Sequence, residues 1–209
     1  MTKLSLFLLT LASTLAQSQV DDSSCPQRDF PFCSSAHEVN FDDLPATTGL
    51  LLTTPNECLE SYGKLGYENF SVFSLPQLGS THMAGFQLGI GTHRITRGEN
   101  MESFYPRYFD FVCALPTLAL GVAAAVDCSI RITPSGPGLE GRWTECAFTA
   151  GGLLSPLEPA SCWLGDWGGS LVTEAITIEV VQPAVLSTLY AFGMTNFGYV
   201  DCIPPRWAW

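Results

Sequence analysis

Near the middle of the chain, apolar side chains recur at every second position. Val126, Cys128, Ile130 and Ile132 alternate with polar residues, which is the period of a β-strand that buries one face. Similar alternation returns in shorter runs, separated by segments rich in glycine and proline such as 134–138. No stretch keeps the 3.6-residue period of a helix over ten positions. The pattern predicts an all-β fold, an antiparallel β-sandwich of the jelly-roll type.

The first residues have the features of a secretory signal peptide. Lys3 precedes an apolar run over 4–15 that ends in small residues and is too short to span a bilayer. We therefore expect a secreted, extracellular protein without a membrane span. The expected organisation is a signal peptide (1–18), a disulfide-tethered irregular N-terminal arm (19–37) and one β-sandwich domain (38–209).

Eight cysteines follow the signal segment, and an even number in an exported chain predicts four disulfide bonds. They are Cys25, Cys33, Cys58, Cys113, Cys128, Cys146, Cys162 and Cys202. The first pair that we expect is Cys128 with Cys146, because the 134–138 turn joins their two predicted strands. No Cys-x-x-Cys motif occurs, which disfavours a zinc or redox site.

The charge of the chain narrows the choice of partner. The formal net charge is −11, with nine Lys and Arg residues in all. Nucleic-acid binding needs clustered cations, so a nucleic-acid partner is disfavoured, as is adsorption to an anionic membrane surface. A glycan or a protein partner remains open.

Several short motifs occur in order along the chain. They are Val39-Asn40-Phe41-Asp42-Asp43-Leu44-Pro45, Tyr62-Gly63-x-x-Gly66-Tyr67-x-Asn69-Phe70, Tyr108-Phe109-Asp110-Phe111, Cys128-Ser129-Ile130-Arg131-Ile132 and Tyr199-Val200-Asp201-Cys202-Ile203. Together they resemble a loose, mostly uncharacterised group of fungal secreted cysteine-containing proteins, over roughly 39–203. The resemblance implies a jelly roll similar to carbohydrate-binding modules, although Tyr67 stands where that group usually has a tryptophan. It also implies a fungal effector or wall-associated protein as the biological setting.

Three aspartates are candidate ligands of a structural calcium ion. The first and last strands of jelly-roll modules are often neighbours, which would bring Asp42 and Asp43 close to Asp201. Calcium accepts an irregular shell made only of oxygen ligands. The alternative is that Asp42 and Asp43 cap a turn and that Asp201 is solvated.

Three aromatic residues are candidates for a sugar-binding platform. Trp163 and Trp167 lie in a glycine-rich segment beside Cys162, where a disulfide bond would hold their geometry, and Tyr67 is the third. An exposed aromatic ring offers a rigid apolar face with a polar edge, on which a sugar ring stacks. The alternative for any one of them is packing in the core.

The chain contains no recognisable catalytic signature. His82 lies near Ser80, but the surrounding sequence is not a Gly-x-Ser-x-Gly elbow. The sequence Asn69-Phe70-Ser71 is an N-glycosylation sequon, so we expect a glycan on Asn69 in a secreted chain.

Three hypotheses about function follow. The first is a secreted binding protein for a glycan or a host or cell-wall surface component, which predicts exposed, coplanar Trp163 and Trp167. The second is a polysaccharide lyase or hydrolase on the same scaffold, which predicts a cleft with a carboxylate pair or a histidine at its floor. The third is a protein-interaction module without a small ligand, which predicts a broad apolar patch.

Overall fold

The computed structural model describes residues 33–48, 58–75, 78, 81–87, 93–99, 101–116, 123–151, 157–165, 173–182 and 191–202. These residues form strands and no α-helix, as the alternating sequence pattern predicts. The strands are β1 (Cys33–Val39), β2 (Thr47–Thr48), β3 (Cys58–Tyr62), β4 (Leu65–Ser74), β5 (His82–Gln87), β6 (His93–Arg97), β7 (Ser103–Pro116), β8 (Ala123–Ala125), β9 (Cys128–Ser135), β10 (Thr144–Phe148), β11 (Ala160–Trp163), β12 (Ala175–Gln182) and β13 (Ala191–Cys202). Within the described ranges, no helix has the length and apolar character needed to cross a membrane.

One continuous sheet contains all of the described strands. Its order is β10-β9-β12-β6-β4-β5-β13-β7-β11, and β1, β2, β3 and β8 pair beside this path. Every pairing is antiparallel except the short one between β2 and β4. β1 pairs with β13, so the expectation that the first and last strands are neighbours is confirmed.

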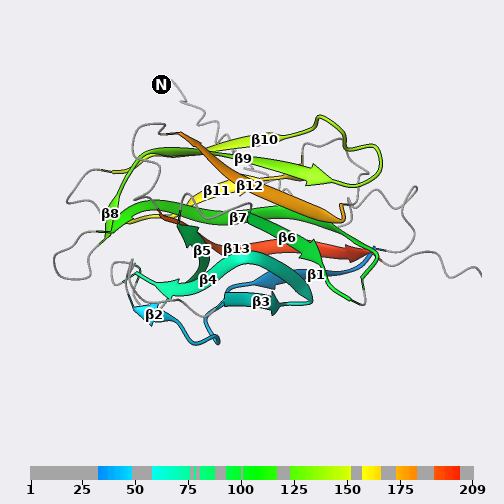
Figure 1. Ribbon diagram of the computed structural model, residues 1–209, viewed down its shortest axis with the longest axis horizontal. Helices are drawn as coiled ribbons and strands as arrows, with labels where there is room; N and C mark the ends of the chain where they lie inside the picture. The colour runs from blue at the N-terminus through cyan, green and yellow to red at the C-terminus, as the bar shows by residue number, and fades with distance from the viewer. Residues whose placement is uncertain are drawn as a thin grey trace, which may run out of the picture.

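The sheet turns a corner within β4. Residues 65–68 pair with β6, whereas residues 71–74 pair with β5. Between the two halves lies Asn69, whose φ of 65° is in the left-handed region that asparagine tolerates better than most residues. A strand that changes partners at such a bend can pass from one layer of a sandwich to the other. Figure 1 shows β4, in cyan, curving strongly between β3 and β6.

Because of this corner, the sheet folds over and its two ends meet. Disulfide bonds join Cys113 of β7 to Cys128 of β9 and Cys146 of β10 to Cys162 of β11. In Figure 1, β10 and β11 accordingly lie close together although they are the two ends of the strand order. The result is the expected antiparallel β-sandwich stapled by disulfides, with one layer around β9 and β12 and the other around β13 and β7.

The space between the layers is filled by aromatic and branched side chains. Ile130 and Ile132 are fully buried and Cys128 nearly so, which confirms the inward face predicted for β9. Phe111 of β7 contacts Phe148 of β10 across the layers, with ring centroids 6.2 Å apart. Such contacts supply the hydrophobic stabilisation that a domain of this size needs.

The predicted bond between Cys128 and Cys146 is wrong. In the β9–β10 ladder, Cys146 lies opposite Ile130 and Cys128 lies opposite Phe148, so the two cysteines are offset by two positions. The side chains of Cys128 and Cys146 both point inward, toward the other layer of the sandwich. Each therefore finds its partner there, on β7 or β11, rather than on the neighbouring strand.

Two other expectations about the N-terminal half need correction. Residues 33–37, expected in an irregular arm, belong to β1 because they form ladder pairs with β13. The thiol of Cys58, expected in a disulfide bond, is free and exposed at the start of β3. Cys202 is disulfide-bonded as expected, whereas Cys25 and the expected signal peptide lie outside the described residues.

Candidate functional site

A row of four residues crosses the outer face of the layer that contains β13 and β7. In the ladders, Glu38 of β1 is paired with Gly198 of β13, Gly198 with Tyr108 of β7, and Tyr108 with Trp163 of β11. Directly paired residues of antiparallel strands point to the same face of the sheet. Their chain neighbours Phe109 and Cys162 are buried on the opposite, inner face.

Tyr108 is held flat against the sheet by a glycine. A Cβ atom at Gly198 would lie only 2.5 Å from Cε1 of the Tyr108 ring, so any larger residue there would displace the ring. The Tyr108 hydroxyl donates a hydrogen bond of 2.9 Å to the Glu38 carboxylate. Burial and, after it, this hydrogen bond raise the pKa of Tyr108, which keeps the hydroxyl protonated as a donor.

Trp163 lies beside this anchored ring and is largely open to solvent. Its side chain is 63% exposed, and its ring centroid is 5.2 Å from that of Tyr108 with an angle of 45° between the two planes. The two rings thus form a continuous aromatic surface, although they do not lie in one plane. We call Tyr108 and Trp163 the aromatic surface.

Polar groups flank the aromatic surface on the next row. The Asp110 carboxylate accepts hydrogen bonds from the Ser161 hydroxyl, at 2.6 Å, and from the Asn196 side-chain amide, at 2.8 Å. Both donors fix the position of the carboxylate on the same face as Tyr108, two residues away along β7. Rigid rings next to fixed carboxylate, hydroxyl and amide groups are the combination that binds polyhydroxyl ligands.

The three predicted platform residues differ in their positions. Trp163 is exposed, as a platform residue must be, and Trp167 lies outside the described residues. The prediction that Tyr67 is a platform residue is wrong, because Tyr67 is 4% exposed and packs edge-on against Phe41 and Phe70. Its inward orientation follows from pairing with Ile95 in the β4–β6 ladder, because Ile95 is fully buried. Burial also raises the pKa of Tyr67 far above its usual range.

Tyr108 was not among the predicted site residues, although the sequence carries a signal for it. In Tyr108-Phe109-Asp110-Phe111 the two phenylalanines alternate with a tyrosine and an aspartate. This alternation places Tyr108 and Asp110 on the polar side of a half-buried strand.

The three aspartates proposed for calcium make separate contacts. Asp201 is 8% exposed and lies 3.2 Å from Lys64 Nζ and 3.3 Å from His37 Nε2. Asp42 accepts a hydrogen bond from the backbone N–H of His82, at 2.9 Å, and Asp43 accepts one from the Tyr62 hydroxyl. Within the described ranges, no group of three or more His, Cys, Asp or Glu side chains is placed to hold a metal.

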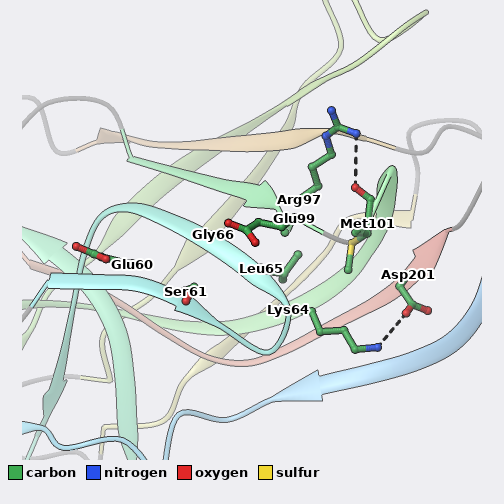
Figure 2. A pocket seen from close by; sticks show the side chains of 10 residues that line it. Glu60, Ser61, Lys64, Leu65, Gly66, Arg97, Glu99, Met101 and Asp201 are labelled. Carbon is green, nitrogen blue, oxygen red and sulfur yellow. Dashed lines mark hydrogen bonds and ion pairs between the residues drawn. The ribbon is translucent and has the colours of Figure 1, made fainter.

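A hollow of about 770 Å³ opens at the end of the β3–β4 hairpin, on a different part of the molecule. Figure 2 shows Lys64 reaching toward Asp201 and Arg97 toward the backbone of Met101. Arg97 also donates a hydrogen bond of 2.8 Å to the carbonyl oxygen of Glu102. The lining includes the carboxylates of Glu60, Glu99 and Asp201, of which the buried Asp201 is paired with Lys64.

No protein-family model matches the chain, and no curated protein matches its sequence. Among solved structures, two variants of CBM29-2, a family 29 carbohydrate-binding module studied for its ligand recognition, are similar to it. One has a TM-score of 0.41 and 8% identity over 79% of this chain and 85% of the module. The other has a TM-score of 0.37 and 12% identity over 82% of this chain and 99% of the module.

Proposed function

We propose that the protein is a secreted, extracellular binding protein that recognises a neutral glycan through the aromatic surface. The observation that carries the proposal is the pairing of the exposed Trp163 with Tyr108, whose ring is anchored over Gly198. Sugar rings stack on such rigid faces at little cost in side-chain entropy, and the neighbouring carboxylates hydrogen-bond their hydroxyl groups.

The charge of the surface supports a neutral ligand. Glu38 and Asp110 lie on this face, and the whole chain carries a net charge of −11. A uronate or sulfate group would be repelled here, whereas a neutral polyol would not. Arg107, next to Tyr108 in the chain, is one cation against these two carboxylates.

The extracellular setting and the modification at Asn69 belong to the same proposal. The signal-like N-terminus and the disulfide bonds support passage through an oxidising secretory route. The fungal effector or wall-associated role rests on the sequence resemblance described above. Asn69 is exposed in the folded chain, as the acceptor of an N-linked glycan must be.

The test is retention of the purified protein on insoluble cellulose, chitin, mannan, xylan and β-1,3-glucan, with released sugars measured in the same samples. We expect retention on at least one polymer without release. Trp163→Ala should weaken it about tenfold or more, equivalent to about 1.4 kcal/mol, and Trp163→Phe should restore part of the loss.

The matched control is the double variant Glu60→Gln/Glu99→Gln in the hollow, which should bind as the wild type does. A loss of retention in this variant with none in Trp163→Ala would transfer the site to the hollow. Release of oligosaccharides by the wild type would indicate the lyase or hydrolase instead. Absence of both retention and release on every polymer would refute the proposal.

A further inference from the structure

Trp143 is the other strongly exposed large apolar side chain among the described residues. It is 55% exposed and directly precedes β10. The guanidinium carbon of Arg131, on β9, lies 5.0 Å from the centroid of the indole. Trp143 thus lies on the sheet over β9, in contact with a cation, and is not part of the core.

The two exposed tryptophans belong to opposite faces of the sandwich. Cys146 and Cys162 point inward, because their disulfide bond joins β10 to β11 between the layers. Trp163 is adjacent to Cys162 and so points outward from β11. Arg131, which contacts Trp143, lies between the buried Ile130 and Ile132 and so points outward from β9. Because β9 and β11 belong to facing layers, these outward directions are opposed.

The surroundings of Trp143 resemble those of Trp163 in chemistry. Arg131 Nη2 lies 3.6 Å from a carboxylate oxygen of Glu145. In the next ladder Arg131 is paired with Glu179. An indole face is therefore combined with the N–H donors of a half-exposed guanidinium group and with carboxylate acceptors.

The charges of this face favour a neutral occupant. Arg131 is paired with Glu145, Arg94 on β6 lies 3.5 Å from Glu68 on β4, and Glu179 adds one further carboxylate. Paired charges with one carboxylate in excess neither attract a polyanion nor repel a polyol, and aromatic rings flanked by donors and acceptors bind sugar rings. A strongly ionic partner would need a larger excess of one sign.

We propose that Trp143, Arg131 and Glu145 form a second contact site for a neutral glycan. The protein is then bivalent, with one site on each face, and it bridges two glycan chains or two segments of one polymer. This inference rests on the proposed function, because the same class of ligand occupies both sites. Linked sites raise apparent affinity for a polymer by about 10²-fold or more without any new contact.

The test compares the wild type with Trp143→Ala, Trp163→Ala and the double variant. Calorimetric titration with cellohexaose, chitohexaose, mannohexaose, xylohexaose and laminarihexaose measures the number of ligands per chain. We expect two for the wild type, one for each single variant and none for the double variant. Soluble derivatives of the same polymers should become turbid with the wild type and stay clear with either single variant. Since both side chains are exposed, thermal unfolding of the single variants should match that of the wild type.

The possible failures are distinguishable. If Trp143→Ala keeps the wild-type stoichiometry and turbidity while Trp163→Ala loses binding, bivalency is overturned and the proposed function stands. If the wild type is a dimer in ligand-free solution and Trp143→Ala makes it a monomer, the Trp143 face binds a second copy of the chain and the inference is overturned. If the wild type binds none of the probes, the proposed function fails, and this inference with it.

Discussion

Gly198 is the residue on which the geometry of the aromatic surface depends. A Cβ at this position would meet the Tyr108 ring atoms Cε1, Cζ and Cδ1 at 2.5, 2.7 and 3.0 Å. Such distances are too short for carbon atoms, so the ring of Tyr108 would have to leave its place. The glycine is therefore part of the site although it offers no group to a ligand.

We predict that Gly198→Ala weakens glycan retention about as much as Tyr108→Ala does. The added methyl group displaces the ring and breaks the hydrogen bond to Glu38, and the strain also lowers stability by about 1–3 kcal/mol. Retention and denaturant unfolding should be measured together. Tyr108→Phe is the control, because it keeps the ring over Gly198 and loses only the hydroxyl. Wild-type retention in a folded Gly198→Ala protein would contradict the role assigned to this ring.

His93 is a buried group that makes stability depend on pH. It stacks on Phe86 with ring centroids 3.5 Å apart, and its Nδ1 donates a hydrogen bond of 3.1 Å to the Asn69 carbonyl oxygen. Burial lowers the pKa of His93 from its ordinary value of 6.5, and this effect outweighs the hydrogen bond. The unfolded chain therefore takes up this proton at a higher pH than the folded chain does.

We predict that the contribution of His93 to the free energy of unfolding is fully present above about pH 6.5. It is lost as the pH falls below that value, toward the lower pKa of His93 in the folded state. The free energy of unfolding in denaturant should be measured from pH 7.5 down to 5. His93→Phe retains the stack on Phe86 and should remove this part of the pH dependence, whereas His82→Gln should leave it in place. An unchanged pH profile in His93→Phe would show that other groups cause the loss.

The sequence predicted the exposure of Trp163 but not the burial of Tyr67. Trp163 was predicted as a platform residue because it lies in a glycine-rich segment beside Cys162, and in the structure it points outward because Cys162 points inward. The prediction for Tyr67 was wrong because β4 begins at Leu65 and carries Tyr67 on its inner face. Side chains of a strand alternate between its two faces, so the position of a residue within the strand decides which face it occupies.

At the scale of elements, β11 is a short strand secured at two points. Among the described strands its ladder pairs are with β7 alone, and the Cys146–Cys162 bond joins it to β10. The other bond, Cys113–Cys128, joins longer strands that have further neighbours. The two bonds close similar lengths of chain, with separations of 16 and 15 residues.

We predict that removing either bond lowers the free energy of unfolding by about 2–4 kcal/mol, since the closed loops are of similar length. Cys146→Ser/Cys162→Ser should also weaken glycan binding through Trp163, because β11 loses one of its two attachments. Cys113→Ser/Cys128→Ser is the matched control and should lose stability with little change in affinity while folded. Equal losses of affinity in both folded variants would show that β11 has no special dependence on its disulfide.

The corner of β4 depends on the left-handed conformation of Asn69. We predict that Asn69→Ala lowers stability by about 1–2 kcal/mol, because a Cβ-bearing residue without a short polar side chain resists this conformation. Asn69→Gly should be tolerated, since glycine adopts it freely. Urea unfolding of unglycosylated protein measures the difference, and equal stability of the alanine and glycine variants would contradict the strain argument.

Asn69 is also the predicted site of N-glycosylation, and this prediction can be tested separately. Secreted from a eukaryotic host, the wild type should carry one N-linked glycan that an endoglycosidase removes. Both Asn69→Gly and Ser71→Ala should lose it, although only the first replaces the residue at the corner. A wild-type protein of unmodified mass would refute glycosylation at Asn69.

The sequence predicted which segments form strands better than it predicted how the strands are arranged. The alternation over 126–132 predicted β9 and its inward face correctly, because it depends only on local period. The disulfide pairs could not be predicted for a physical reason. Cys128 and Cys146 lie on neighbouring strands, but each is bonded to a cysteine of the opposite layer. Which layer faces which depends on the bend at Asn69, where β4 changes partners from β6 to β5.

At the scale of the whole molecule, the net charge of −11 sets a limit on the ligand. Stacking of sugar rings on Trp163 involves no ions, whereas a carboxylated or sulfated polymer would approach a surface of its own sign. Salt screens such repulsion over about 8 Å at physiological ionic strength, but it creates no attraction.

We predict that retention on a neutral polysaccharide changes little between low and high salt, and that heparin and polygalacturonate retain no protein at any salt concentration. The measurement is the bound fraction on each polymer over a salt series, with Trp163→Ala as the control for stacking. Because the face that carries Trp163 also carries Glu38 and Asp110, adding a cation there should relax this selectivity. Glu38→Lys should therefore gain salt-sensitive binding to heparin while Trp163 still governs binding to the neutral polymer. Salt-sensitive retention of the wild type on heparin would mean that the ligand is recognised by ionic contacts, and it would contradict a site built on aromatic stacking.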